Sequence, residues 1–253
     1  MRRLASNARE AGGVPQLGSG DGAILLAHED STQSAFFGTQ IEVPPPPVSM
    51  LNVLARSQTL DLNFEPVFFP SIEFKADSDF PGWIVRPESF FWRALEAGKV
   101  QPNAARLPGA WALFDTTDKP RPGELIYEDD PLAELISSLR AAGAVRRSQD
   151  VPDGARVLIS MPELQREVFP ALANLLKIKA GGASIRVPRA MEYSFLGNLR
   201  YPFLGDGLTR EWLHDQVGEF DRLVAGFRLN GVDLYLASTR HVSLGFRPLI
   251  IVY

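Results

Sequence analysis

Three residues that could transfer protons lie within one short segment near the C-terminal end of the chain. Glu211, His214 and Asp215 combine two carboxyl groups with an imidazole, and such groups act as general acids and bases when they surround a substrate. In the alternative, structural interpretation, Trp212 packs in the core and Glu211 accepts a hydrogen bond in a buried site or a loop. We favour the structural interpretation, because no serine, cysteine or metal-binding partner stands nearby in the sequence.

A second group of carboxylates occurs in the segment Tyr-Glu-Asp-Asp-Pro. Glu128, Asp129 and Asp130 offer the oxygen ligands that a hard cation prefers. Pro131, however, suits the start of a helix, and Asp130 then fits the N-cap position, where a carboxylate also interacts favourably with the helix dipole. We favour the cap over a metal site.

The lack of cysteine and the wide spacing of the histidines exclude several kinds of chemistry. The chain has no cysteine, and its only histidines, His28, His214 and His241, are widely separated. Disulfides, thiolate metal sites and cysteine nucleophiles are therefore excluded. Arg222 and Arg247 are expected to bind loop carbonyl groups rather than a substrate. The sequence thus predicts neither a metal nor another cofactor.

Length and composition are those of an ordinary globular protein. The 253 residues are 45% hydrophobic and 22% charged, and the net charge is −4. A mildly acidic chain has no general attraction for nucleic acid, so we expect no nucleic-acid partner. No apolar run reaches the length of a membrane span, and no signal-peptide core follows the basic start of the chain. We therefore expect the chain to be cytoplasmic when made.

The elements that must position these residues follow from hydrophobic periodicity and from helix stop signals. Helices are expected over 87–98, 131–142, 162–178 and 188–197. Strands are expected over 22–27, 33–43, 109–115, 157–160, 183–187 and 242–252. Residues 205–243 show few regular periods, which usually marks a functional segment. The four prolines of 44–47 predict a stiff linker, so we expect an N-terminal segment over 1–58 and one domain over 59–253.

Four blocks near the C-terminal end resemble a known family. The blocks are IRVPRAMEYSFLGNLRYPFLGD (185–206), REWLHD (210–215), DRLVAG (221–226) and LGFRPL (244–249). Their order and spacing are similar to those of the formylglycine-generating-enzyme branch of the C-type lectin fold. The RPL ending and the short loop before the last block resemble more closely the variable proteins of diversity-generating retroelements. Those are ligand-binding proteins whose C-terminal region is rewritten by mutagenic reverse transcription.

The resemblance implies an α+β, C-type lectin-like fold, with two helices packed on a twisted, mostly antiparallel sheet and long C-terminal loops. It does not extend to the enzymes' chemistry. Formylglycine-generating enzymes work through cysteines, and the sulfoxide-forming relatives use a His-x3-His-x-Glu iron site; this chain has neither. The lectin calcium motifs Glu-Pro-Asn, Gln-Pro-Asp and Trp-Asn-Asp are also missing. The resemblance therefore implies a ligand-binding protein that is not an enzyme.

Residues 227–243 mix aromatic, cationic, acidic and hydroxyl side chains without a regular period, as loops that carry function on a rigid scaffold do. In the resembled proteins, mutated adenines often lie in Asn codons, which cannot become Lys, Glu, Gln, Met or Trp. None of these five residue types occurs over 227–243. We expect a variable region over about 205–245 with these ligand contacts: Leu213, His214, Phe220, Phe227, Arg228, Leu229, Asn230, Asp233, Tyr235, Ser238, Thr239, Arg240, His241 and Ser243.

The expected partner is a protein or another macromolecule bound by the C-terminal loops, and an oligomer is compatible with this. Leu244, Gly245 and Phe246 are expected to be scaffold. Three alternatives stay open. The stretch 227–243 could be an ordinary surface loop and strand. The chain could be an enzyme of the formylglycine-generating branch with a non-cysteine site, which predicts a deep pocket with perturbed carboxylates around Glu211 and Asp215. It could also be a structural module of a virion or a cell surface.

Overall fold

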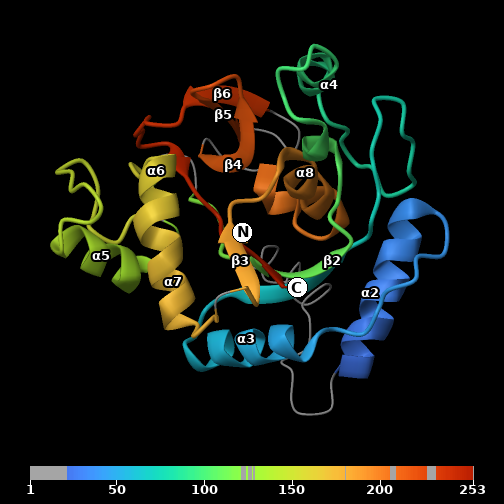
Figure 1. Ribbon diagram of the computed structural model, residues 1–253, viewed down its shortest axis with the longest axis horizontal. Helices are drawn as coiled ribbons and strands as arrows, with labels where there is room; N and C mark the ends of the chain where they lie inside the picture. Colours follow the sequence, from blue (N-terminus) through green and yellow to red (C-terminus); the bar gives the residue numbers. More distant parts are fainter. Residues whose placement is uncertain are drawn as a thin grey trace, which may run out of the picture.

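The computed structural model describes residues 22–120, 124, 127, 129–179, 181–205, 209–226 and 232–252, with side chains for all of these except 22 and 232–235. They form an α+β structure with two four-stranded sheets (Figure 1). Nearly all strand pairs are antiparallel. The α+β class predicted from the sequence is confirmed.

The first sheet joins strands that lie far apart in the sequence. In spatial order it consists of β1 (Phe64–Phe69), β2 (Ala110–Asp115), β8 (Leu249–Val252) and β3 (Ala183–Arg186). All four residues of β8 are buried, because the strand lies between β2 and β3 and is covered on both faces. A strand buried on both faces appears in the sequence as a continuous apolar run rather than as an alternation. The strands predicted over 109–115 and 183–187 are confirmed.

The second sheet lies entirely in the C-terminal part of the chain. In spatial order it consists of β6 (Val232–Leu236), β5 (Asp221–Ala225), β4 (Arg210–Val217) and β7 (Leu244–Gly245). The prediction that 205–243 lacks regular structure is wrong for these strands. The pairing of β4 with β5 shifts between Trp212 and Gln216. Residues 211–213 are buried on both faces of the sheet, with Trp212 in one core cluster and Leu213 in the other, so the alternation that would have revealed a strand is missing there.

Helix α8 (Ala190–Leu199) lies between the two sheets (Figure 1). Residues 190–198 are all buried. Their apolar side chains pack in one cluster with residues of both sheets, among them Phe114 of β2 and Leu213 of β4. The helix predicted over 188–197 is therefore confirmed, and it forms the central layer of the fold.

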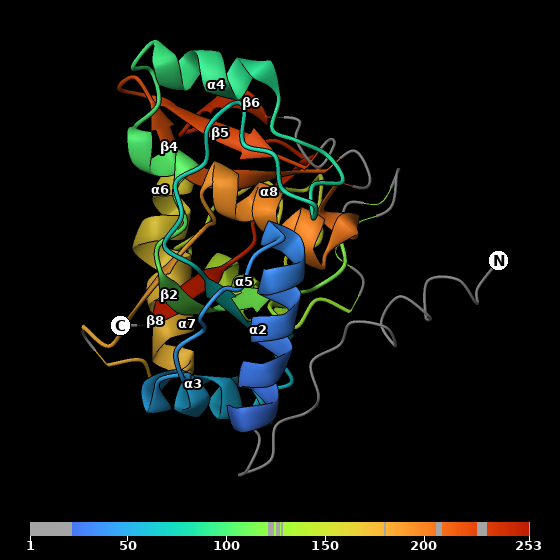
Figure 2. The same ribbon diagram turned by 90° about the vertical axis from the view of Figure 1, so that its right-hand side faces the viewer.

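The other helices surround this three-layered centre. They are α2 (Gly22–Phe37), α3 (Val48–Thr59), α4 (Ser89–Glu96), α5 (Ala133–Ala141), α6 (Met161–Glu163) and α7 (Phe169–Leu175), with 3-10 turns at Pro102–Ala105 and Pro202–Gly205. The helices predicted over 87–98, 131–142 and 162–178 are confirmed, the last as α6 and α7 joined by the π-helical turn Leu164–Val168. In Figure 2, α4 lies beyond the second sheet and α3 at the opposite end of the molecule. Among the described residues, no helix is long and apolar enough to cross a bilayer.

Three predictions of strands are wrong. Residues 22–27 and 33–43 were expected as strands, but Gly22–Phe37 is the helix α2. Its buried positions include Glu29 and Gln33, so polar residues interrupt the apolar stripe that would have indicated a helix. Residues 157–160 do not form a strand, because Leu158 has a φ of +60°, which ends an extended run.

The described part of the N-terminal segment packs into the same core as the rest of the chain. Met50 and Leu54 of α3 belong to a cluster that also contains Trp111 of β2 and Phe246. The indole Nε1 of Trp111 donates a hydrogen bond of 2.9 Å to the carbonyl of Pro44. The proline run therefore lies against the core and leads directly into α3.

Candidate functional site

The surface that carries the described predicted contacts Phe220, Ser238, Thr239, Arg240, His241 and Ser243 is formed by the turn between β4 and β5 and by residues 236–243. The latter leave the edge strand β6 and return to β7 at the other edge of the sheet. We call this region the C-terminal surface. Its described side chains include Phe220, Leu236, Ser238, Thr239, Arg240, His241 and Ser243.

Backbone hydrogen bonds anchor the segment 237–243 to the scaffold. The carbonyl of Ala237 accepts from the N–H of Met161 at 3.0 Å, and the carbonyl of His241 accepts from the N–H of Leu158 at 3.2 Å. The carbonyl of Ser243 accepts from the first N–H of β4 at 2.7 Å. These three backbone carbonyls hold the path of the backbone, and the side chains of Arg240 and His241 add hydrogen bonds, to Glu163 and from the N–H of Ser243 respectively.

The side chains of the C-terminal surface, in contrast, are largely free of the core. Phe220 is 65% exposed and Leu236 is 55% exposed. Ser238, Arg240 and His241 are exposed as well. An apolar pair beside a hydroxyl, a guanidinium and an imidazole offers the mixed contacts that protein-binding surfaces use.

One of these side chains also fastens the surface to helix α6. The Nε of Arg240 lies 3.0 Å from Oε2 of Glu163. The same carboxylate accepts from the N–H and the hydroxyl of Ser160 and from the N–H of Arg146. Burial alone would raise the pKa of Glu163, but these hydrogen bonds, with that of Arg240, lower it to about 2. The carboxylate therefore stays ionised at neutral pH.

The other predicted contacts fall into three groups. Phe227, Arg228, Leu229 and Asn230 lie outside the described residues. Asp233 and Tyr235 belong to β6, where their backbones pair with Val224 and Arg222.

The expectation for Leu213 needs correction: its side chain is 0% exposed and packs on the α8 side of β4, so it cannot touch a ligand at the surface. His214 is half-buried.

Glu211 is held in a buried polar cluster instead of an open acid–base site. Its Oε1 lies 2.9 Å from Nη2 of Arg247 and accepts from the hydroxyl of Tyr127 at 2.9 Å. Burial would raise the pKa of Glu211, but the charges of Arg247 and Lys119 outweigh it and lower the pKa to about 2. Trp212 is buried and donates from Nε1 to the carbonyl of Ile159. The structural interpretation of both residues is confirmed.

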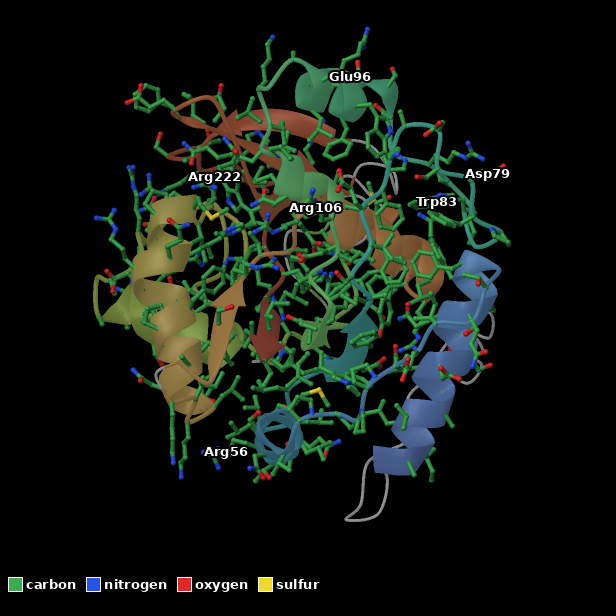
Figure 3. The ribbon with its side chains drawn as sticks, turned by 45° about the vertical axis from the view of Figure 1, so that its right-hand side comes forward. Arg56, Asp79, Trp83, Glu96, Arg106 and Arg222 are labelled. Carbon is green, nitrogen blue, oxygen red and sulfur yellow. The ribbon has the colours of Figure 1, made fainter. Side chains whose placement is uncertain are left out.

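Both arginines that were expected to bind carbonyl groups do so. Nη1 of Arg247 donates to the carbonyls of Asp115 and Thr117, each at 2.7 Å. Nη1 of Arg222 donates to the carbonyl of His214 at 2.5 Å. Figure 3 shows Arg222 beside the second sheet, near the upper end of the α6–α7 helix.

Asp215 is the second carboxylate of the predicted acid–base group, and it is only 4% exposed. Its Oδ2 accepts from the N–H of Ala190 at the start of α8, at 2.6 Å. Burial raises the pKa of Asp215 to about 6. Glu211 and Asp215 are thus perturbed in opposite directions, but both are closed off from a substrate in solution.

Asp130 acts mainly as the partner of a buried arginine. Its Oδ1 accepts from the N–H of Leu132, but Leu132 itself is the N-cap of α5 and the helix has no side-chain cap, so the predicted cap at Asp130 is wrong. Arg156 binds the same carboxylate at 2.6 Å. Arg156 reaches Asp115 as well, so one guanidinium joins two carboxylates. Glu128 lies outside the described residues. Within the described ranges, no three His, Asp or Glu side chains are grouped as a metal site would require.

A groove beside His214 was not expected from the sequence. It lies between the α6–α7 helix, β3 and β4, has a volume of about 300 Å³ and is lined in part by Gln165, Phe169, Ile185 and His214. No sequence signal marks it, because its walls come from three separate segments. Gln165 belongs to the π-helical turn, and such turns are frequent at functional sites.

Comparisons of this chain with family models, with curated proteins and with solved structures gave no match.

Proposed function

We propose that this protein is a non-enzymatic ligand-binding protein that presents a diversifiable C-terminal surface on a C-type lectin-like scaffold. The proposal joins the resemblance to retroelement variable proteins with one structural observation. The segment 237–243 is anchored through backbone carbonyls, whereas Ser238, Arg240 and His241 expose their side chains. A surface built in this way keeps its backbone path when its side chains change.

The energetics of substitution support this assignment. Changes at exposed positions away from caps and core usually alter the free energy of unfolding by only about 0.5 kcal/mol. A backbone that is already ordered also reduces the entropy that binding must overcome. The exposed Phe220 and Leu236 add apolar area to the same surface. New side chains can therefore change affinity for a macromolecular partner without loss of the fold.

The arrangement of helices and sheets supports the C-type lectin-like part of the proposal. Helix α8 and the α6–α7 helix pack on mostly antiparallel sheets, and long connections follow in the C-terminal part. The enzyme alternative requires reactive carboxylates in a pocket open to a substrate. Glu211 is fully buried and paired with Arg247, which favours a structural role over catalysis.

Sequencing of the gene in a population of source cells tests the diversified-binder proposal. We expect a near-copy of the 3′ end close to the gene that differs at adenine positions, together with a reverse transcriptase gene. Variable codons should then map to the C-terminal surface and to residues 227–235, and they should avoid buried Leu213 and Trp212. An invariant 3′ end with no near-copy would refute diversification.

A further inference from the structure

The groove between the α6–α7 helix, β3 and β4 has the features of a small-molecule site. Buried apolar side chains, Met161, Phe169 and Val187, form part of its lining. Polar groups enter it from two sides: the amide of Gln165 from the π-helical turn and the imidazole of His214 from β4. Its volume of about 300 Å³ is at the lower end of the range for ligand pockets, so it suits a ligand of about ten non-hydrogen atoms.

The imidazole of His214 is available to a ligand. Its backbone is occupied, because its N–H donates to the carbonyl of Pro188 at 2.8 Å and its carbonyl accepts from Arg222. The ring nitrogens, in contrast, have no hydrogen-bond partner within the described part of the chain. A half-buried imidazole without a partner is costly unless water or a ligand binds it.

The charges around His214 favour an anion. Burial first, and then the positive charges of Arg186, Arg189 and Arg222, lower the pKa of His214 to about 4. Glu192 opposes this effect and is bound by both nitrogens of the Arg186 guanidinium at 2.6 and 2.7 Å. These two charges largely cancel, so the positive charges of Arg189 and Arg222 remain. Asp215 is also near, but its carboxylate already accepts from Ala190 N–H. The remaining field at the ring is positive.

We propose that this groove is a binding site for a small organic carboxylate. The apolar part of the ligand packs on Phe169 and Ile185, and its carboxylate accepts hydrogen bonds from the ring of His214 and the amide of Gln165. A phosphate fits less well, because its three oxygens require more donors than these two groups supply. This site does not rest on the proposed function, because none of its lining residues belongs to the C-terminal surface; this includes His214, which the sequence placed among the predicted contacts.

Benzoate is a suitable probe, and the three histidines of the chain make it easy to follow. Benzoate titrated into the full-length protein should shift the ring resonances of His214 in a saturable way and leave those of His28 and His241 unchanged. The variant His214→Gln assigns the resonance. Benzyl alcohol, which has a similar shape without the charge, should bind about tenfold more weakly or not at all.

Two neighbouring substitutions on α7 separate groove binding from other effects. Ala173 lines the groove, whereas Asn174 is exposed and is not among its lining residues. Ala173→Phe should abolish the shift, and Asn174→Phe should preserve it. A carboxylate beside the ring favours the imidazolium, so the affinity for benzoate should rise as the pH falls from 7 towards 5.

His214→Gln should weaken benzoate binding about tenfold and reduce that pH dependence to the part that comes from Asp215, whose pKa of about 6 lies in the same range. The proposal is refuted if His214 shows no saturable shift, if the shift survives Ala173→Phe in a folded protein, or if benzyl alcohol binds as well as benzoate. None of these results bears on whether the C-terminal surface varies.

Discussion

Arg247 and Glu211 form a fully buried ion pair that connects the two sheets. Glu211 belongs to β4 of the second sheet, and Arg247 stands between β7 and β8, where the chain passes from the second sheet to the first. The distance between Nη2 and Oε1 is 2.9 Å, and both side chains are 0% exposed. The same guanidinium binds the carbonyls of Asp115, the last residue of β2, and of Thr117, so the pair links three segments.

Removal of this arginine should be strongly destabilising. Arg247→Met keeps much of the volume but leaves the Glu211 carboxylate buried without its main partner, which typically costs about 3–5 kcal/mol. Urea denaturation of the two proteins measures the difference. Arg86→Met is the matched control, because it breaks an ion pair with Asp79 whose side chains are 49% and 77% exposed. It should cost less than about 1 kcal/mol, and equal losses would contradict the assigned role of Arg247.

Asp215 should make stability depend on pH in a direction opposite to that of most acidic residues. Its pKa is raised from 3.8 to about 6 in the folded protein, so the folded state binds the proton more tightly than the unfolded state does. The free energy of unfolding therefore falls as the pH rises from about 4 to about 6, by about 1.4 kcal/mol per unit of pKa shift.

The variant Asp215→Asn isolates this effect, because it mimics the protonated carboxyl group. It should match the wild type near pH 4 and exceed it in stability above pH 6, as measured by denaturation at each pH. His214 contributes with the opposite sign between about 4 and 6.5, since its pKa is lowered, but it is present in both proteins and cancels. A difference that is constant across this range would contradict the raised pKa.

The C-terminal surface and the core beneath it should respond differently to truncation. Ser238→Ala and Arg240→Ala should each change the free energy of unfolding by less than about 1 kcal/mol. Ser238 is exposed, and Glu163 keeps its hydrogen bonds from Ser160 and Arg146 when the partly exposed Arg240 is removed. Leu213→Ala, on β4 of the same sheet, should lower the free energy of unfolding by about 2–5 kcal/mol, because it leaves a cavity against α8. Thermal denaturation of the three variants tests this, and a large loss for Arg240→Ala would contradict its place on the display surface.

Gly245 should tolerate no side chain. A Cβ atom at this position would lie 2.5 Å from the hydroxyl of Tyr127 and 3.2 Å from its ring, and that hydroxyl donates to Glu211. Gly245→Ala should therefore lower stability by about 1–3 kcal/mol. Gly182→Ala is the control, because its nearest contact would be an ordinary one of 3.4 Å. If the two variants melt at the same temperature, the close packing of Tyr127 on β7 is not a stability determinant.

Local patterns in the sequence determined the elements whose apolar spacing is regular. Helices α4 and α5, the continuous α6–α7 helix, and the strands β2 and β3 lie where periodicity and stop signals predict them. The buried interpretation of Glu211 and Trp212 also followed from the sequence, because no reactive partner stands near them. Composition excluded thiol chemistry without any reference to structure.

Tertiary structure alone decided the remainder, because the deciding contacts join residues far apart in the chain. Glu29 is buried on α2 because Arg200, at the end of α8, pairs with it, so the apolar stripe of α2 is incomplete in the sequence. Burial of β4 on both faces, with Trp212 on one side and Leu213 towards α8 on the other, hides its strand pattern. The groove at His214 exists only where β3, β4 and the α6–α7 helix meet. The periodicity of apolar residues predicts which side of a helix or strand is buried. It does not predict which distant strand or charged residue packs against that side.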